Sequence, residues 1–153
     1  MQSRTEYVVD TTRSSLENRD ETIRLLIGLL DEEAAKYECD LPFSRQADWP
    51  LEVREAASLL ASLRAPKSQE NAHYRQTGVH ERSDAEVWGA FVTFAPYAFD
   101  ASVWDPAGHQ VLSLADEGTS VVARLTDAEA EVLSRSRRVP VVKLKNWQRA
   151  KRT

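Results

Sequence analysis

The stretch that decides the fold is residues 85–126, AEVWGAFVTFAPYAFDASVWDPAGHQVLSLADEGTSVVARLT. It contains four runs of β-branched, aromatic and aliphatic residues, and each run is about as long as a strand. The connections are short: DPAG at 105–108 fits a type I turn, and DEG at 116–118 fits a hairpin loop in which glycine takes a positive φ. This pattern predicts a four-stranded antiparallel β-meander.

Aromatic side chains are expected on both faces of that meander. The first run, 87–94, leaves neither face of a strand polar, and it places Trp88 and Phe94 on the same face. The second run alternates apolar and polar residues around Asp100 and ends at Trp104, as a half-buried strand does. Since large apolar patches are rare on monomers, we expect a face that exposes Trp88, Phe94 and Trp104 to be an interaction surface or a ligand cleft.

Two helices are predicted before the meander. Residues 23–37 carry apolar side chains at i, i+3 and i+4 spacing after an N-cap at Asn18, which predicts an amphipathic helix. Residues 51–63 repeat this spacing after Pro50, a residue suited to a first helical turn. The two helices are expected to form an antiparallel hairpin that covers one face of the sheet.

The remaining N-terminal segments are expected to be irregular. Residues 1–15 are mostly polar and predict a loose terminus or a short edge strand. Residues 39–49 predict a loop. Residues 67–84 are polar and almost free of aliphatic side chains, which predicts a connecting loop between the helical half and the sheet.

After the meander the sequence predicts a helix, a strand and a tail. Thr126 and Glu129 have the spacing of a capping box, which opens a helix over 127–137. The valines near 141 then predict a short strand, which Pro140 confines to a sheet edge.

We therefore expect an α+β fold, with two N-terminal helices packed on the meander and a third helix and a short edge strand behind it. The chain is expected to be a single domain, 1–153, with these parts: a helical half 1–66, a polar connecting loop 67–84, a β-meander 85–126, a helix 127–137, and an edge strand with basic tail 138–153.

Composition is ordinary for a globular protein, with 42% hydrophobic and 29% charged residues in 153. No apolar run reaches the roughly 18–20 residues of a membrane span, and the first residues lack the apolar core of a signal peptide. A single cysteine, Cys39, excludes an internal disulfide. These features predict a cytoplasmic protein, and fifteen arginines against five lysines favour a bacterial origin.

Charge is distributed unevenly along the chain. Residues 135–153 contain eight basic residues and no acidic one, so the −4 of the whole chain leaves −12 on residues 1–134. The basic tail comprises Lys143, Lys145, Arg149, Lys151 and Arg152, with Trp147 among them. Three roles are open for it: docking on the acidic body of the same or a neighbouring chain, contact with a partner protein, and phosphate contact with nucleic acid, in which Trp147 would stack.

Motifs of catalysis and of metal or cofactor binding are missing. There is no G-x-S-x-G, and the five glycines are too scattered for a phosphate-binding loop. The three histidines, His73, His80 and His109, lack the spacing of metal ligands. We therefore expect no cofactor and no metal.

The leading hypothesis is a non-enzymatic interaction or regulatory module that binds another protein or its own copy. The residues expected to take part, besides the basic tail, are Trp88, Phe94, Asp100, Trp104, His109, Arg124 and Trp147. One alternative is a small-molecule enzyme or binder with a pocket between sheet and helices, in which Asp100 is a general base near Trp104 and His109. The other alternative is nucleic-acid association through the tail. Stacking of nucleobases on the sheet is not expected, because Arg124 is the only basic residue among the aromatic residues of the sheet.

Overall fold

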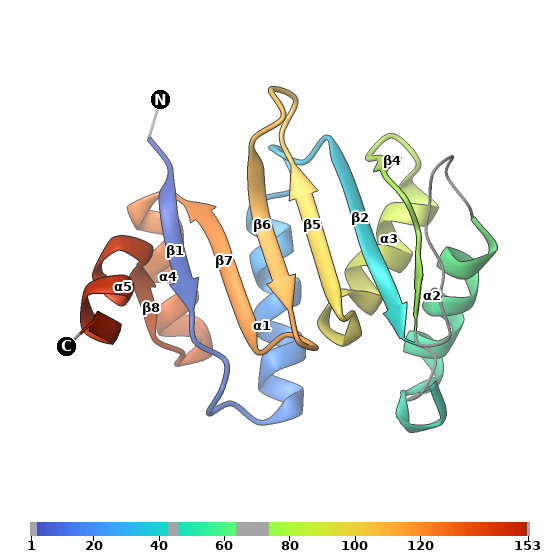
Figure 1. Cartoon of the computed structure of the whole chain (residues 1–153), viewed down its shortest axis with the longest axis horizontal. Helices are drawn as coiled ribbons and strands as arrows, with labels where there is room; N and C mark the ends of the chain where they lie inside the picture. The colour runs from blue at the N-terminus through green and yellow to red at the C-terminus, as the bar shows by residue number, and fades with distance from the viewer. Residues whose placement is uncertain (1–2, 43–45, 64–73, 153) are drawn as a thin grey trace.

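The computed structural model describes residues 3–42, 46–63 and 74–152. It is an α+β fold built on one eight-stranded antiparallel sheet of order β3-β2-β5-β6-β7-β1-β8, with β4 paired to β2 (Figure 1). The strands are β1 (Thr5–Val9), β2 (Lys36–Pro42), β3 (Tyr74–Gln76), β4 (His80–Glu81), β5 (Asp100–Trp104), β6 (Gln110–Ala115), β7 (Ser120–Leu125) and β8 (Val141–Lys143).

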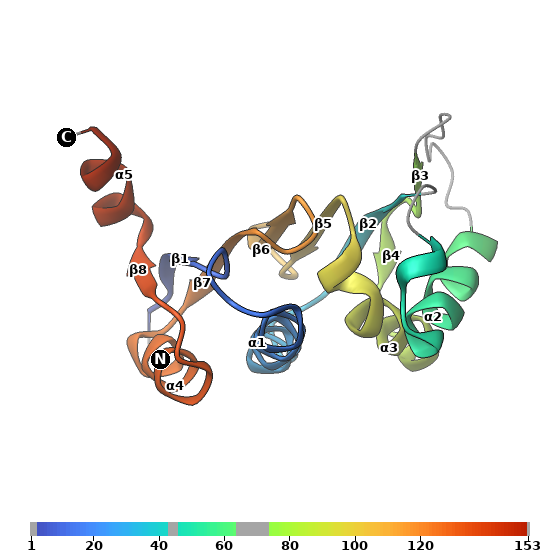
Figure 2. The same ribbon diagram turned by 90° about the horizontal axis from the view of Figure 1, so that it is seen from below.

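Four helices form a second layer on one face of this sheet (Figure 2). They are α1 (Leu16–Leu29), α2 (Leu51–Ser62), α3 (Ala85–Phe94) and α4 (Asp127–Arg137), with the 3-10 turns η1 (Gln46–Asp48) and η2 (Ala95–Tyr97). Helix α1 packs beside α4, and α2 packs beside α3. The core lies between the layers, and its largest fully buried side chains include Tyr37, Phe91, Phe94, Ile23, Leu26, Leu60, Leu112 and Leu133.

Several sequence predictions are confirmed. Helix α4 covers 127–137 and opens on a capping box, in which Thr126 Oγ1 accepts from the Glu129 N–H and the Glu129 carboxylate accepts from the Thr126 N–H. Strands β5, β6 and β7 form a meander. Strand β8 is a sheet edge that follows Pro140.

The prediction of a strand at 87–94 is wrong, because this run is helix α3. Asp84 caps it by accepting from the backbone N–H groups of Glu86 and Val87. Four of its buried side chains fall at i, i+3, i+4 and i+7, namely Val87, Ala90, Phe91 and Phe94, and Trp88 is buried as well. A helix packed on two sides needs apolar residues around most of its circumference, and this composition also fits a strand that is apolar on both faces.

The predicted helix from Asn18 to residue 37 is confirmed over residues 18–29 and is wrong beyond them. Helix α1 starts after Ser15, whose hydroxyl accepts from the Asn18 N–H, and it ends at Leu29. Residues 36–42 form β2, in which Tyr37, Cys39 and Leu41 are buried while Lys36, Glu38 and Asp40 are not. This alternation of buried and less buried residues is typical of a strand. Its first buried residue, Tyr37, also fits the helical spacing of the preceding residues, so the two patterns overlap there.

The other differences concern the two ends and the hairpin. Strand β1 lies between β7 and β8 and so is not an edge strand. Helices α1 and α2 do not form a hairpin, since each packs beside a different helix. Within the predicted loop 67–84, β3 and β4 pair with β2, and residues 67–73 lie outside the described part. The predicted tail forms a fifth helix, α5 (Leu144–Arg152).

Candidate interaction surface

Of the helices in the described ranges, α5 alone lies on the face of the sheet opposite α1–α4, and it stands at one end (Figure 2). We call this side of strands β2, β5, β6, β7 and β1 the open face. In β5 and β7, alternate side chains are buried under the helices and the others point to the open face. The open face is formed by Lys36, Glu38, Asp40, Asp100, Ser102, Trp104, Gln110, Ser113, Ala115, Ser120, Val122, Arg124, Glu6 and Val8.

Three carboxylates gather at the β2–β5 end of the open face, and we call them the acidic cluster: Glu38, Asp40 and Asp100. Cys39 pairs with Ala101, so Asp40 and Asp100 are neighbours on adjoining strands. They line a shallow polar hollow of about 280 Å³. Burial raises the pKa of the Asp40 carboxyl to about 6, and repulsion from Asp100 and then Glu38 adds to the effect. Burial and then Asp116 raise the pKa of Asp100.

Helix α5 gives the opposite end a basic character. It contacts β1 and β8, and Lys145 is exposed on it while Trp147 is half-buried. Of the other predicted tail residues, Lys143 lies on β8, opposite Tyr7 of β1. The side chains of Arg149, Lys151 and Arg152 lie outside the described part, although their backbone belongs to α5.

The predicted residues Trp104 and Arg124 lie at the same level on either side of β6. Val103 and Ala123 both pair with Leu112, and Trp104 and Arg124 are the next residues along their strands. Both side chains are half-buried. Trp104 also borders a small apolar hollow of about 270 Å³ with Val79. The open face therefore has an indole and a guanidinium near its centre.

Asp100, Trp104 and His109 do not line one cavity. Asp100 and Trp104 stand at opposite ends of β5 and border different hollows. His109 is exposed in the β5–β6 turn, where Asp105 accepts from its backbone N–H at 2.8 Å. Burial opposes ionisation of Asp105, but the hydrogen bonds from His109 outweigh it and lower the pKa of the carboxyl.

Trp88 and Phe94, which were expected on a sheet face, belong to the helix layer and are buried. The indole N–H of Trp88 donates to Asp31 Oδ1 at 2.9 Å. The Arg82 guanidinium lies 4.8 Å from the centre of the indole ring and also donates to Asp31 at 2.9 Å. These contacts fix the β4–α3 connection to the end of α1, so both aromatic residues are structural.

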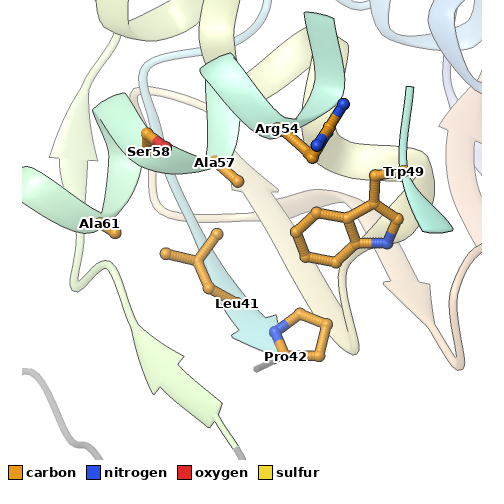
Figure 3. Close-up of a pocket in the computed structure, with 7 residues that line it drawn as sticks. All are labelled: Leu41, Pro42, Trp49, Arg54, Ala57, Ser58 and Ala61. Atoms are coloured by element: carbon orange, nitrogen blue, oxygen red, sulfur yellow. The ribbon is translucent and has the colours of Figure 1, made fainter. Parts of the chain in front are cut away.

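One pocket was not predicted. It has a volume of about 200 Å³ and lies between β2 and α2, with Leu41, Pro42, Trp49, Arg54, Ala57, Ser58 and Ala61 around it. Figure 3 shows the Leu41 side chain and the indole of Trp49 beside α2. An apolar wall with one exposed guanidinium can hold a small apolar carboxylate. This pocket could not be predicted from the sequence, because the residues of β2 and α2 that line it come together only when β2 joins the sheet.

A second unpredicted hollow, of about 370 Å³, lies beside the start of α1 and the β6–β7 turn. At its edge the Tyr97 hydroxyl donates to Asp20 Oδ2 at 2.5 Å. Burial raises the pKa of Asp20, and burial together with the Asp20 carboxylate raises the pKa of Tyr97. The pair joins α1 to η2, which is a structural role.

Comparison with known protein families, curated proteins and solved structures finds no match to this chain. Among the described residues, no three histidine, cysteine, aspartate or glutamate side chains are grouped so that they could hold a metal ion. His73 lies outside the described residues. None of the helices in the described ranges is long and apolar enough to cross a membrane.

Proposed function

We propose that this protein is a non-enzymatic, regulatory binding module whose open face and α5 contact another protein chain. The observation that supports it is the one-sided cover of the sheet: α1–α4 lie on one face, and the opposite face presents half-buried Trp104 and Arg124 between two charged ends. A solvated antiparallel face is usually polar. Here the β2–β5 end has an excess of negative charge, and α5 adds an excess of positive charge at the other end, which favours a partner of complementary charge.

A protein partner agrees with these charges better than nucleic acid does. The acidic cluster lies on the same side of the sheet as α5, and residues 1–134 carry a net −12. A polyanion would gain from α5 and be repelled by the rest of the face. A protein can present a basic region to the acidic cluster and an acidic region to α5.

The experiment compares two arginine substitutions. Ser113→Arg puts a bulky charge at the centre of the open face, and Ala128→Arg puts the same side chain on an exposed position of α4. Tagged wild type and both variants are used to capture two kinds of chain, namely an untagged copy of the protein and the proteins of its host cell. We expect Ser113→Arg to reduce capture of the bound chain about tenfold and Ala128→Arg to leave it unchanged.

The proposal is contradicted when Ser113→Arg captures every chain that the wild type captures. Far-UV circular dichroism and the thermal midpoint of each variant show that a loss of capture comes from the surface and not from unfolding. Retention on heparin that is unchanged by Ser113→Arg and removed by substitutions in α5 would favour nucleic acid instead.

A further inference from the structure

The open face is charged with opposite signs at its two ends. The acidic cluster lies on β2 and β5, towards one edge of the sheet. At the other edge, after β8, α5 contains four basic residues and no acidic one. Figure 2 shows α5 on the open-face side of the sheet, where it can contact whatever covers that face.

The two ends cannot neutralise each other within one chain. Five strand-to-strand steps separate β2 from β8, which is roughly 24 Å at about 4.8 Å per step. The Debye length is about 8 Å at physiological ionic strength, so this separation screens the attraction. Helix α5 has nine residues and is only about 13 Å long, so it does not span the face.

We propose that the occupant of the open face is a second copy of this chain, packed face to face about a two-fold axis that runs parallel to the strands over β6. The inference rests on the proposed function and names its partner. Strand β6 is the middle of the path, with β3, β2 and β5 on one side and β7, β1 and β8 on the other. This axis therefore exchanges the two ends of the sheet and lays α5 of each copy on the acidic cluster of the other.

The charges select this axis over its alternative. A two-fold axis in the same plane but perpendicular to the strands would lay α5 on α5 and the acidic cluster on the acidic cluster. Like charges brought together in this way are repelled, and no cation among the described residues pairs with Asp40 or Asp100 to reduce the repulsion. The parallel axis makes both end contacts attractive.

The centre of the face suits the same arrangement. Along most of β6 the open-face side chains are small, namely Ser113 and Ala115, and they allow two sheets to approach at the axis; Gln110 lies at the start of the strand, where it donates to Ser102 Oγ. Rotation about an axis along the strands keeps each residue at its level. It therefore brings Trp104 of one copy opposite Arg124 of the other, where a guanidinium can lie on an indole.

The test is a pair of charge reversals whose defects cancel when they are mixed. Lys145→Glu makes α5 less basic, and Asp40→Lys makes the acidic cluster less acidic. Each homodimer of either variant contains two weakened contacts, so we expect the dimer Kd measured by sedimentation velocity to rise about tenfold. A mixed dimer contains one native contact and one reversed contact, both attractive, so the one-to-one mixture is expected to regain wild-type affinity. Arg135→Glu, at an exposed position of α4, makes the same change in net charge as Lys145→Glu and is expected to have no effect on the dimer Kd.

A wild type that stays monomeric at about 100 µM overturns the inference. The inference is also contradicted when neither Lys145→Glu nor Asp40→Lys raises the dimer Kd, or when the mixture of the two variants associates no better than each variant alone. The proposed function is judged separately: it survives a monomeric wild type when Ser113→Arg removes capture of a different protein, and it fails when no chain is captured through the open face.

Discussion

The turn between β6 and β7 lies very close to the helix layer, and Gly118 is the point of contact. Its φ is +82°, and a Cβ added there would lie 2.7 Å from Cδ1 of Ile23 and 3.1 Å from the carbonyl oxygen of Pro96. Ile23 is fully buried in α1 and belongs to the hydrophobic core, so its side chain is closely surrounded. The carbonyl oxygen of Gly118 also accepts a hydrogen bond from the buried Thr11 hydroxyl. We therefore expect Gly118→Ala to be strongly destabilising.

The size of the effect follows from two contributions. A left-handed backbone costs about 1 kcal/mol once a Cβ is present. Overpacking against Ile23 and the Pro96 carbonyl adds about 1–3 kcal/mol. Gly108 allows the backbone cost to be measured without the overpacking cost, because its φ is +86° but a Cβ there meets nothing within 4 Å. Gly108→Ala should therefore lose only about 1 kcal/mol, and Gly118→Ala about 3 kcal/mol in all.

Urea unfolding followed by far-UV circular dichroism measures the difference. With a slope of about 2 kcal/mol per M, the midpoint of Gly118→Ala is expected about 1.5 M below wild type, and that of Gly108→Ala about 0.5 M below. Gly28, exposed on α1 with nothing within 4 Å of an added Cβ, gives a control of opposite sign, since alanine stabilises a helix interior by about 0.5–1 kcal/mol. Equal midpoints for Gly118→Ala and Gly108→Ala would refute the close packing of this turn.

Three further predictions concern pH and single contacts. In dilute, monomeric protein, the pKa of Asp40 is about 6 against 3.8 for a free carboxyl, so the native state binds the proton more tightly and stability falls as pH rises from about 4 to 6. Because Asp40 is half exposed, Asp40→Asn should remove only about 1 kcal/mol of that fall, and equal pH profiles would contradict this. Thr126→Ala should lower the free energy of unfolding by about 1 kcal/mol, and an unchanged urea midpoint would show that the capping box does not stabilise the protein. Asp31→Ala removes the acceptor of the Trp88 N–H and should cost about 1–2 kcal/mol, with a change in tryptophan fluorescence as the local readout.

The parts of the fold that the sequence predicts are those that local chemistry specifies. Helix α4 is recognised from the reciprocal hydrogen bonds of Thr126 and Glu129, and these need only residues three apart. The β5–β6–β7 meander is recognised from its alternation and from turns that contain Gly108 and Gly118, both of which have positive φ. In each case the deciding contacts lie within one element or one turn.

The parts that the sequence misassigns depend on distant partners. Helix α3 is apolar around most of its circumference because it meets both the sheet and α2, and this composition is shared with a central strand. The sequence before β2 has helical spacing, and no turn signal marks where that spacing stops. Residues 36–42 form a strand because β5 and β3 pair with them. Asp100 stands out in the sequence as a charge within an apolar strand, but the cluster it forms with Asp40 exists only after β2 and β5 pair.

The edges of the sheet bear on how two copies can associate. At the ends of the path lie β3 and β8, each three residues long, and β8 follows Pro140 and runs directly into α5. Short edge strands offer few unpaired N–H and C=O groups, so growth of the sheet by addition of another strand is disfavoured. Association through the edges is therefore disfavoured at both ends of the sheet. This agrees with the proposed packing of a second copy on the open face, where side chains rather than backbone groups would make the contact.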